Sequence, residues 1–154
     1  MTQHLEALKV GQPLLVSGPE LKITYKGFGT FEMTRDPENP ITRKNFGGIA
    51  GGSGITPIYS IMYHSLTHED KNTNSLIYAN HTPDDYLLKE QIDELAKYNK
   101  KDFKIHHCIS KGEISSSEEN ISVRCGRITK ECIEKNMPAP GPDTFIGYCG
   151  PALF

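Results

Sequence analysis

The chain has 154 residues, a formal net charge of −2 and a pI near 6.3, which is about one domain with a core of its own. Its 17 basic and 19 acidic side chains are interspersed, so no basic field favours a nucleic-acid partner. No apolar run approaches the roughly 20 residues of a membrane helix, and the four cysteines, without C-x-x-C spacing, predict reduced thiols. We therefore expect a cytoplasmic protein whose membrane attachment, if any, lies outside this chain.

The first 33 residues predict β structure after a short opening helix. Leu14 to Val16 form an apolar run before a Gly-Pro turn, and apolar residues alternate with polar ones from Leu21 to Tyr25. Two or three strands of this kind leave edges unpaired and form a sheet that is seldom stable alone. We interpret residues 1–33 as one part of a β-barrel.

A polar stretch that contains two prolines, residues 34–40, follows these strands. Such a composition is typical of a connecting segment, so we expect it to link two domains. The second domain then spans residues 41–154.

A glycine-rich turn lies near the start of this second domain. Phe46 to Ala50 predicts a buried strand, which ends at Gly51-Gly52-Ser53-Gly54. We expect the glycines to adopt positive φ and to let the backbone approach a bound group closely. Thr56 is expected to cap the helix that follows, with Pro57 at its first position. Free amide groups and the helix dipole favour a phosphate there, which makes dinucleotide binding the first hypothesis.

Two features depart from the usual dinucleotide-binding fingerprint. In G-x-G-x-x-G, read from Gly52, Pro57 stands where the last glycine belongs. The next predicted strand ends in Asn80 rather than in the Asp or Glu that would hold a ribose. On these residues alone, a tight strand-to-helix turn without a ligand remains an alternative.

Strands and helices alternate through the rest of the chain. Strands are predicted at 75–80, 103–109 and 144–149, and a loop at 111–122. Helices are predicted from Pro57 through Leu66, from 82–85 to Asn99, and from Arg127 until the Pro-Gly cluster at 138–142. This alternation predicts an α/β fold, with a parallel sheet that has helices on both faces.

Two polar pairs near these helices have structural explanations. His64 and His68 lie four residues apart, but no third ligand accompanies them, so no metal site is expected. Asp84 and Asp85 look like a catalytic carboxylate pair, but acidic residues in a first helical turn stabilise the helix. We favour capping over catalysis for the two aspartates.

The last predicted strand ends in Cys149-Gly150-Pro151. G-G-S-G-I-T-P after one strand and C-G-P after a later one resemble the pyridine-nucleotide domain of the ferredoxin-reductase-like flavoenzymes. Within them the chain is most similar to the NADH-cytochrome b5 reductase family and the flavin module of assimilatory nitrate reductases. Further stretches that match this group are residues 1–3, 16–19, 76–80, 84–88 and 137–141. The resemblance covers nearly the whole chain.

This resemblance implies a fold and a set of roles. Residues 1–33 become the last strands of an antiparallel flavin-binding β-barrel, and residues 41–154 an NAD(P)-binding domain that ends earlier than in the family. Thr56 and Cys149 take the positions that flank hydride transfer from the nicotinamide to the flavin, as catalytic residues. The implied cofactor-binding residues are Gly51, Gly52, Ser53, Gly54, Thr56, Asn80, Ser110, Lys111, Cys149, Gly150 and Pro151 for the nucleotide, and Thr2 for the flavin pyrophosphate. Without the resemblance, Cys149 would be explained as core packing.

The resemblance also bears on the choice of nucleotide. Relatives that are specific for NADH carry an acid near the end of the third strand, where this chain has Ser110 followed by Lys111. A hydroxyl and a cation would tolerate the extra phosphate of NADPH better than an acid does. NADH remains the expected cofactor on the resemblance, with NADPH as an alternative.

The implied function is that of a reductase which transfers a hydride from NADH to FAD and then electrons to cytochrome b5 or another haem acceptor. One alternative is the same module within assimilatory nitrate reductase. Another, of a different class, is a nucleotide-binding or interaction module without catalysis. FAD is expected in the full-length protein, and these 154 residues alone are expected to show no appreciable diaphorase activity.

Overall fold

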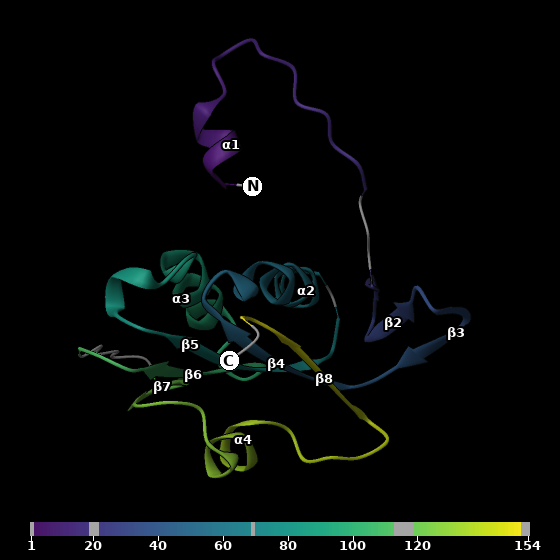
Figure 1. Cartoon of the computed structure of the whole chain (residues 1–154). Coiled ribbons are helices and arrows are strands. Elements are labelled where there is room, and N and C mark those ends of the chain that lie inside the picture. Colours follow the sequence, from purple (N-terminus) through teal and green to yellow (C-terminus); the bar gives the residue numbers. More distant parts are fainter. Residues whose placement is uncertain (1, 19–21, 69, 113–118, 152–154) are drawn as a thin grey trace.

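The computed structural model describes residues 2–18, 22–68, 70–112 and 119–151. A three-stranded antiparallel sheet, in the order β1-β2-β3, precedes a five-stranded parallel sheet in the order β7-β6-β5-β4-β8 (Figure 1). The small sheet consists of β1 (Ile23–Gly27), β2 (Thr30–Met33) and β3 (Asp36–Thr42). The large sheet consists of β4 (Asn45–Gly51), β5 (Thr73–Asn80), β6 (Phe103–Ile109), β7 (Ile121–Cys125) and β8 (Thr144–Cys149).

Helices cover both faces of the large sheet, so the predicted α/β arrangement is confirmed. Figure 1 shows α2 (Ile55–Thr67) and α3 (Lys89–Tyr98) on one face and α4 (Lys130–Asn136) on the other. Two 3₁₀ turns, η1 (Gly52–Gly54) and η2 (Pro83–Asp85), follow β4 and β5. None of the described helices is both long and apolar enough to cross a membrane.

The N-terminal region differs in part from its prediction. The short opening helix is present as α1 (Thr2–Ala7), which Figure 1 shows apart from the two sheets. Leu14 to Val16, predicted as a strand, form no regular structure, and the side chain of Leu15 is fully exposed. The prediction failed because an apolar run forms a strand only where a neighbouring strand pairs with it.

The stretch at 34–40, expected to be a link, contributes most of β3. Strand β3 pairs with β2, for example Phe31 with Ile41. Its side chains from Asp36 to Pro40 are exposed, which explains why their polar composition looked like a loop. Proline is tolerated because this strand lies at the edge of the small sheet.

Aromatic packing joins the small sheet to the large one. The Phe31 ring, which is 1% exposed, lies 4.3 Å from the Phe145 ring and 5.6 Å from the Phe46 ring, centroid to centroid. The Tyr25 ring lies 5.0 Å from the Phe31 ring, and its hydroxyl donates to Asp70 Oδ2 at 2.6 Å and accepts from Asn72 Nδ2 at 2.9 Å. These contacts tie β1 and β2 to the core under α2.

Strand β7 was missed by the sequence analysis, which extended the loop after β6 through Ser122. In the structure Ile121 is buried and pairs with Ile105 of β6. Strand β7 is only five residues long and pairs with one neighbour, so its apolar residues are too few for the sequence to predict a strand there. Its presence brings Arg127, which follows it, to the same end of the sheet as Asn80 and Ser110.

The strand order creates a crevice beside β4. Strands β5, β6 and β7 follow one another on one side of β4, whereas β8 lies on its other side. All five strands are parallel, so their carboxyl ends lie along one edge of the sheet. In open α/β sheets, ligands bind at the carboxyl edge where the strand order reverses. Here that point lies between the ends of β4 and β8.

Candidate functional site

The turn after β4 places the first part of the site. Of its glycines only Gly52 has a positive φ, 51°, whereas Gly51 is extended and Gly54 is helical. The prediction of several positive φ values is therefore wrong. The Tyr78 hydroxyl donates to the Gly52 carbonyl at 3.2 Å, and burial raises the pKa of this phenol. Tyr78 thus stays a neutral donor that holds the turn in place.

Gly54 brings this turn against the end of β8. A Cβ atom built on Gly54 would lie 2.1 Å from the Cys149 carbonyl oxygen and 2.7 Å from the Gly150 nitrogen. Real Cβ atoms do not approach backbone atoms so closely, so only glycine permits this packing. The two motifs that the sequence analysis singled out, almost 100 residues apart, therefore meet at the crevice between β4 and β8.

Thr56 lies in the first turn of α2 but does not cap it. The helix begins at Ile55 after Gly54, without a side-chain cap, and Thr56 Oγ1 donates to the Ser53 carbonyl at 3.1 Å. Pro57 is consequently the third helical residue and not the first. The capping prediction was wrong because the 3₁₀ turn of Gly52–Gly54 runs directly into the helix. The Ile55 amide donates to the carbonyls of Gly52 and Ser53, and no side chain in the described part of the chain caps the helix.

A cleft of about 1000 Å³ extends along the carboxyl edge of the sheet. Five of the predicted site residues line it: Gly51, Gly52, Asn80, Ser110 and Pro151. The remaining ones, Ser53, Gly54, Thr56, Lys111, Cys149 and Gly150, are outside its lining, although Gly54 contacts Cys149 and Gly150 directly. Thr2 begins α1, which lies apart from this edge (Figure 1). The role proposed for Thr2 stays a prediction.

Asn80 has an unusual environment in this cleft. Its side chain is 8% exposed, and neither amide atom has a hydrogen-bond partner in the described part of the chain. A buried amide without a partner costs roughly 1–3 kcal/mol. The hydroxyl groups of Tyr78 and Tyr86 lie near the Asn80 amide, but neither forms a hydrogen bond with it. The hydrogen-bonding capacity of the Asn80 amide is therefore not used by the described residues.

The ends of β5 and β6 are joined by main-chain hydrogen bonds. The Ser110 amide donates to the Asn80 carbonyl at 3.3 Å, and the Lys111 amide donates to the His81 carbonyl at 2.8 Å. Both side chains are exposed at this edge. The cleft residues that the sequence analysis did not assign to a site are Ala79, His81, Asp84, Asp85, Leu87, Gly126, Arg127 and Ile128. Arg127 had been placed only at a helix start, because its position depends on the strand β7 that was missed.

Of the two aspartates that line the cleft, Asp84 and Asp85, the second caps a helical turn as predicted. Asp85 Oδ2 accepts hydrogen bonds from both the amide and the hydroxyl of Thr82, each at 2.8 Å, and these bonds lower the pKa of Asp85. The capping explanation is confirmed for Asp85. The capped element is the 3₁₀ turn η2, however, and α3 begins only at Lys89, after Leu88 in a left-handed conformation.

The comparisons with known proteins agree with this geometry. Residues 49–154 match the family described as "Oxidoreductase NAD-binding domain". The chain is 37% identical, over 153 residues, to NADH-cytochrome b5 reductase 2 of Scheffersomyces stipitis, and 35% identical to the NADH nitrate reductase of Volvox carteri. Each alignment covers 98% of this chain but only 45% and 17% of the relatives, so the chain spans less than half of either protein.

A solved structure extends the comparison. The cytochrome b5 reductase domain of Ulva prolifera nitrate reductase superposes with a TM-score of 0.83 at 31% identity, covering 98% of this chain and 55% of that chain. The protein is thus an oxidoreductase domain of the α/β nucleotide-binding class. The chain belongs to the NAD-binding domain family of cytochrome b5 reductases and nitrate reductases, which confirms the resemblance seen in the sequence.

Proposed function

We propose that this chain binds NADH and forms the nucleotide-binding part of a flavoprotein reductase that passes electrons to cytochrome b5 or another haem acceptor. The names of its relatives support this, since NADH-cytochrome b5 reductases match nearly the whole chain. Bound FAD would supply the step from two-electron hydride transfer to one-electron transfer. The residues of this chain bind the dinucleotide, orient it and exclude water.

One observation carries the proposal: the contact of Gly54 with Cys149 and Gly150 at the reversal of strand order. This contact brings the N-terminus of α2, which has no side-chain cap, next to the end of β8. Amide groups and the helix dipole favour the pyrophosphate of a dinucleotide. Cys149 is part of this contact and Thr56 follows Gly54 by two residues, so the nicotinamide would be held beside these two side chains for hydride transfer.

The cleft from Asn80 to Arg127 suits the adenosine half of the nucleotide. Asn80 offers a buried donor and acceptor, and Arg127 offers an exposed guanidinium. No acid follows β6 at Ser110, and Lys111 adds a second cation nearby. We propose NADH as the physiological donor and expect NADPH to bind as well, because Ser110 and Lys111 carry no negative charge that would repel a further phosphate.

Calorimetric titration of the purified chain with NADH and NADPH, after an absorbance scan for flavin, tests the proposal. We expect one nucleotide per chain. Gly54→Ala should weaken binding at least about tenfold, because the added Cβ separates the two motifs, a loss of about 1.4 kcal/mol. The matched control is Gly141→Ala, since a Cβ there meets no atom within 4 Å. A folded chain that binds neither nucleotide would contradict the proposal and favour a module without catalysis.

A second setting for the same module is an assimilatory nitrate reductase, which the match to the Ulva prolifera reductase domain favours. The two settings differ in the domains that accompany the module. Sequencing the transcript on both sides of the region for residues 1–154 tests this. Coding sequence for haem and molybdenum domains would support nitrate reductase, and its absence would support a separate cytochrome b5 reductase.

A further inference from the structure

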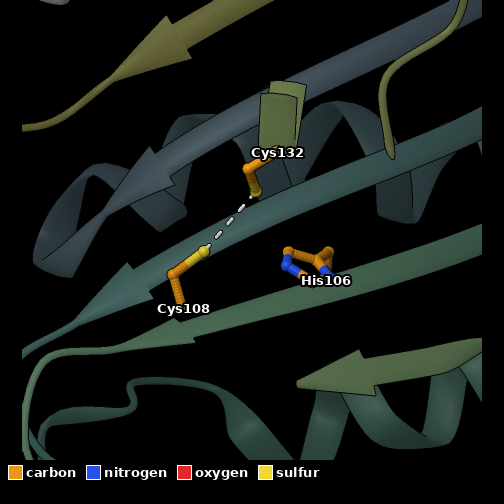
Figure 2. A group of neighbouring side chains, drawn as sticks. All are labelled: His106, Cys108 and Cys132. Carbon is orange, nitrogen blue, oxygen red and sulfur yellow. Dashed lines mark hydrogen bonds between the residues drawn. The ribbon is translucent and has the colours of Figure 1, made fainter. Parts of the chain in front are cut away.

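A cluster of three metal-ligand side chains lies in the core between α4 and the sheet, away from the cleft described above. His106 and Cys108 lie two residues apart on β6 and therefore on the same face, and Cys132 lies on α4. One ligand atom from each residue lies within 4.8 Å of the others. Figure 2 shows the three side chains together, with Cys132 above the strand that carries the other two. All three are at least nine-tenths buried.

We propose that His106, Cys108 and Cys132 bind a single thiophilic closed-shell metal ion, with Cu(I) preferred to Zn²⁺.

The spacing of the two thiols fits such an ion. Cys108 Sγ and Cys132 Sγ lie 3.9 Å apart. Two sulfurs that bind one ion at about 2.3 Å, with an angle between tetrahedral and trigonal, lie roughly 3.8–4.0 Å apart. The ion could therefore be accepted with little movement of α4 relative to β6. Binding would release the two thiol protons to solvent, and no electron transfer is needed when the ion is supplied as Cu(I).

The hydrogen bonds of His106 leave one ring nitrogen available. Ser122 Oγ donates to the Ile105 carbonyl at 3.3 Å, so its oxygen accepts from His106 Nδ1 at 2.7 Å. With the proton on Nδ1, the lone pair of the ring is on Nε2. This Nε2 is buried and has no hydrogen-bond partner among the residues that the structure describes. Metal-binding histidines typically donate their second N–H in this way, which fixes the orientation of the ring.

Groups around the cluster favour a monovalent ion. The described residues supply three donors, a number that suits Cu(I), whereas structural Zn²⁺ usually takes four. Two thiolates and one Cu(I) leave a net charge of −1, and Arg124 and Lys135 are close enough to act on His106. The Asn136 amide, which donates to the Cys132 carbonyl at 2.8 Å, also lies 3.8 Å from Cys132 Sγ. An N–H directed at the sulfur stabilises a thiolate.

A second cleft, at the opposite end of the sheet from the nucleotide cleft, reaches His106. This cleft of about 660 Å³ opens between the sheet and the end of α4, and His106, Asn136 and Met137 form part of its wall. An ion could enter past His106 without unfolding the domain. The alternative is that the two thiols only fill the core. That alternative does not explain why His106 Nε2 is buried without a partner among the described residues.

The test uses the whole chain, reduced with a phosphine and incubated either with Cu(I) as its acetonitrile complex or with Zn²⁺. Metal per chain is measured by atomic emission after gel filtration. We expect one Cu(I) per chain and protection of Cys108 and Cys132 from alkylation, read by peptide mass spectrometry, while Cys149 still reacts. Weaker retention of Zn²⁺ is expected in a parallel sample.

Variants separate this site from unspecific thiol binding. Cys108→Ala and Cys132→Ala should each lower the bound copper from one per chain toward zero, and His106→Gln should weaken binding at least about tenfold. The matched control, Cys149→Ser, should bind one Cu(I) per chain, as the unmodified chain does. Circular dichroism checks that each variant folds. A folded chain that binds neither ion would overturn the proposal, and so would copper that persists in a variant that combines Cys108→Ala with Cys132→Ala. One Zn²⁺ per chain without copper would overturn the preference for Cu(I).

Discussion

The two faces of the five-stranded sheet are built differently. The face under α2 and α3 holds a large core that includes Phe46, Tyr78, Tyr86 and Phe103, and Phe31 extends it into the small sheet. The face under α4 holds a small core of Ile77, Cys108, Cys132 and Met137. Aromatic rings bury much apolar area, whereas the seven-residue α4 covers only a limited part of its face. The first face therefore supplies most of the stability, and the second accommodates sulfur and imidazole groups.

Neighbouring histidines on β6 show the contrast at one point. His107 faces the aromatic core, where its ring lies edge-on to Tyr86 at 4.9 Å, whereas His106 faces α4 and is hydrogen-bonded to Ser122. Side chains of a strand alternate between its faces, so one residue of shift separates an apolar site from a polar one. Substitutions on opposite faces of the sheet should consequently change the free energy of unfolding by unequal amounts.

The largest difference is expected between Phe46→Ala and Met137→Ala. Phe46 is 2% exposed and packs against Phe31 and Phe145, so its loss should lower the free energy of unfolding by about 3–5 kcal/mol. Met137 lies at the edge of the small core, and its loss should cost about 2 kcal/mol. Urea unfolding of both variants measures this. Equal costs would show that the two faces contribute alike.

Acid should weaken the aromatic face through His107. Burial lowers the pKa of His107 from 6.5 to about 4. Between these two values the unfolded chain binds a proton that the folded chain does not, so stability falls as the pH decreases through this window. The loss at pH 4 should reach about 3 kcal/mol relative to pH 7.

Urea unfolding at several pH values tests this effect against a His107→Leu variant. The variant lacks the titrating ring, so its stability should fall by about 3 kcal/mol less than that of the unmodified chain over the same pH range. Parallel pH curves for the two proteins would contradict a neutral, buried His107.

Two adjacent glycines of β4 offer a matched pair of smaller effect. A Cβ on Gly48 would lie 2.4 Å from Ile58 Cγ2 and 2.8 Å from Met62 Cε, both in buried residues under α2. A Cβ on Gly47 would lie 2.4 Å from Ile146 Cδ1 and 2.9 Å from Met137 Sδ, the ends of two flexible side chains, and 3.1 Å from Pro138 Cδ. Ile146 is 40% exposed, so its side chain has room to move. Gly48→Ala should thus cost about 1–3 kcal/mol and Gly47→Ala less. A reversed order in thermal unfolding would refute this difference between the faces.

The smallest effect is expected at the helix starts. Thr129 caps α4, its hydroxyl accepting from the Cys132 amide at 3.3 Å, so Thr129→Ala should cost about 1 kcal/mol. Thr56 does not cap α2, and Thr56→Ala should change stability by less than about 0.5 kcal/mol. The two variants are compared by thermal unfolding. A larger cost at Thr56 would mean that its hydroxyl stabilises the turn through Ser53 more than expected.

Local pattern was sufficient for the strands that carry the site. Apolar runs bounded by polar or glycine residues predicted β6 and β8 with the bounds that the structure has, and β4 and β5 within one or two residues. The resemblance in the two glycine-containing motifs likewise predicted the family that the comparisons show. Both are properties of short stretches of chain, which need no knowledge of distant residues.

The local sequence pattern gave wrong predictions where strand pairing or packing against distant residues decides the structure. Leu14 to Val16 had strand composition and no partner, whereas polar residues from Asp36 became β3 because β2 pairs with them. Thr56 had the right side chain for a cap, but the 3₁₀ turn placed it inside the helix. These differences depend on neighbours that a single stretch does not specify.

The sequence by itself determined the strands β4, β5, β6 and β8 and the two glycine-containing motifs, because periodicity and glycine placement act within a few residues. Tertiary structure alone decided that Gly54 presses against Cys149, that Asn80 is buried without a partner, and that His106, Cys108 and Cys132 converge. Each of these depends on contacts between elements far apart in the chain. Such contacts arise only when the sheet is assembled and the helices cover its faces.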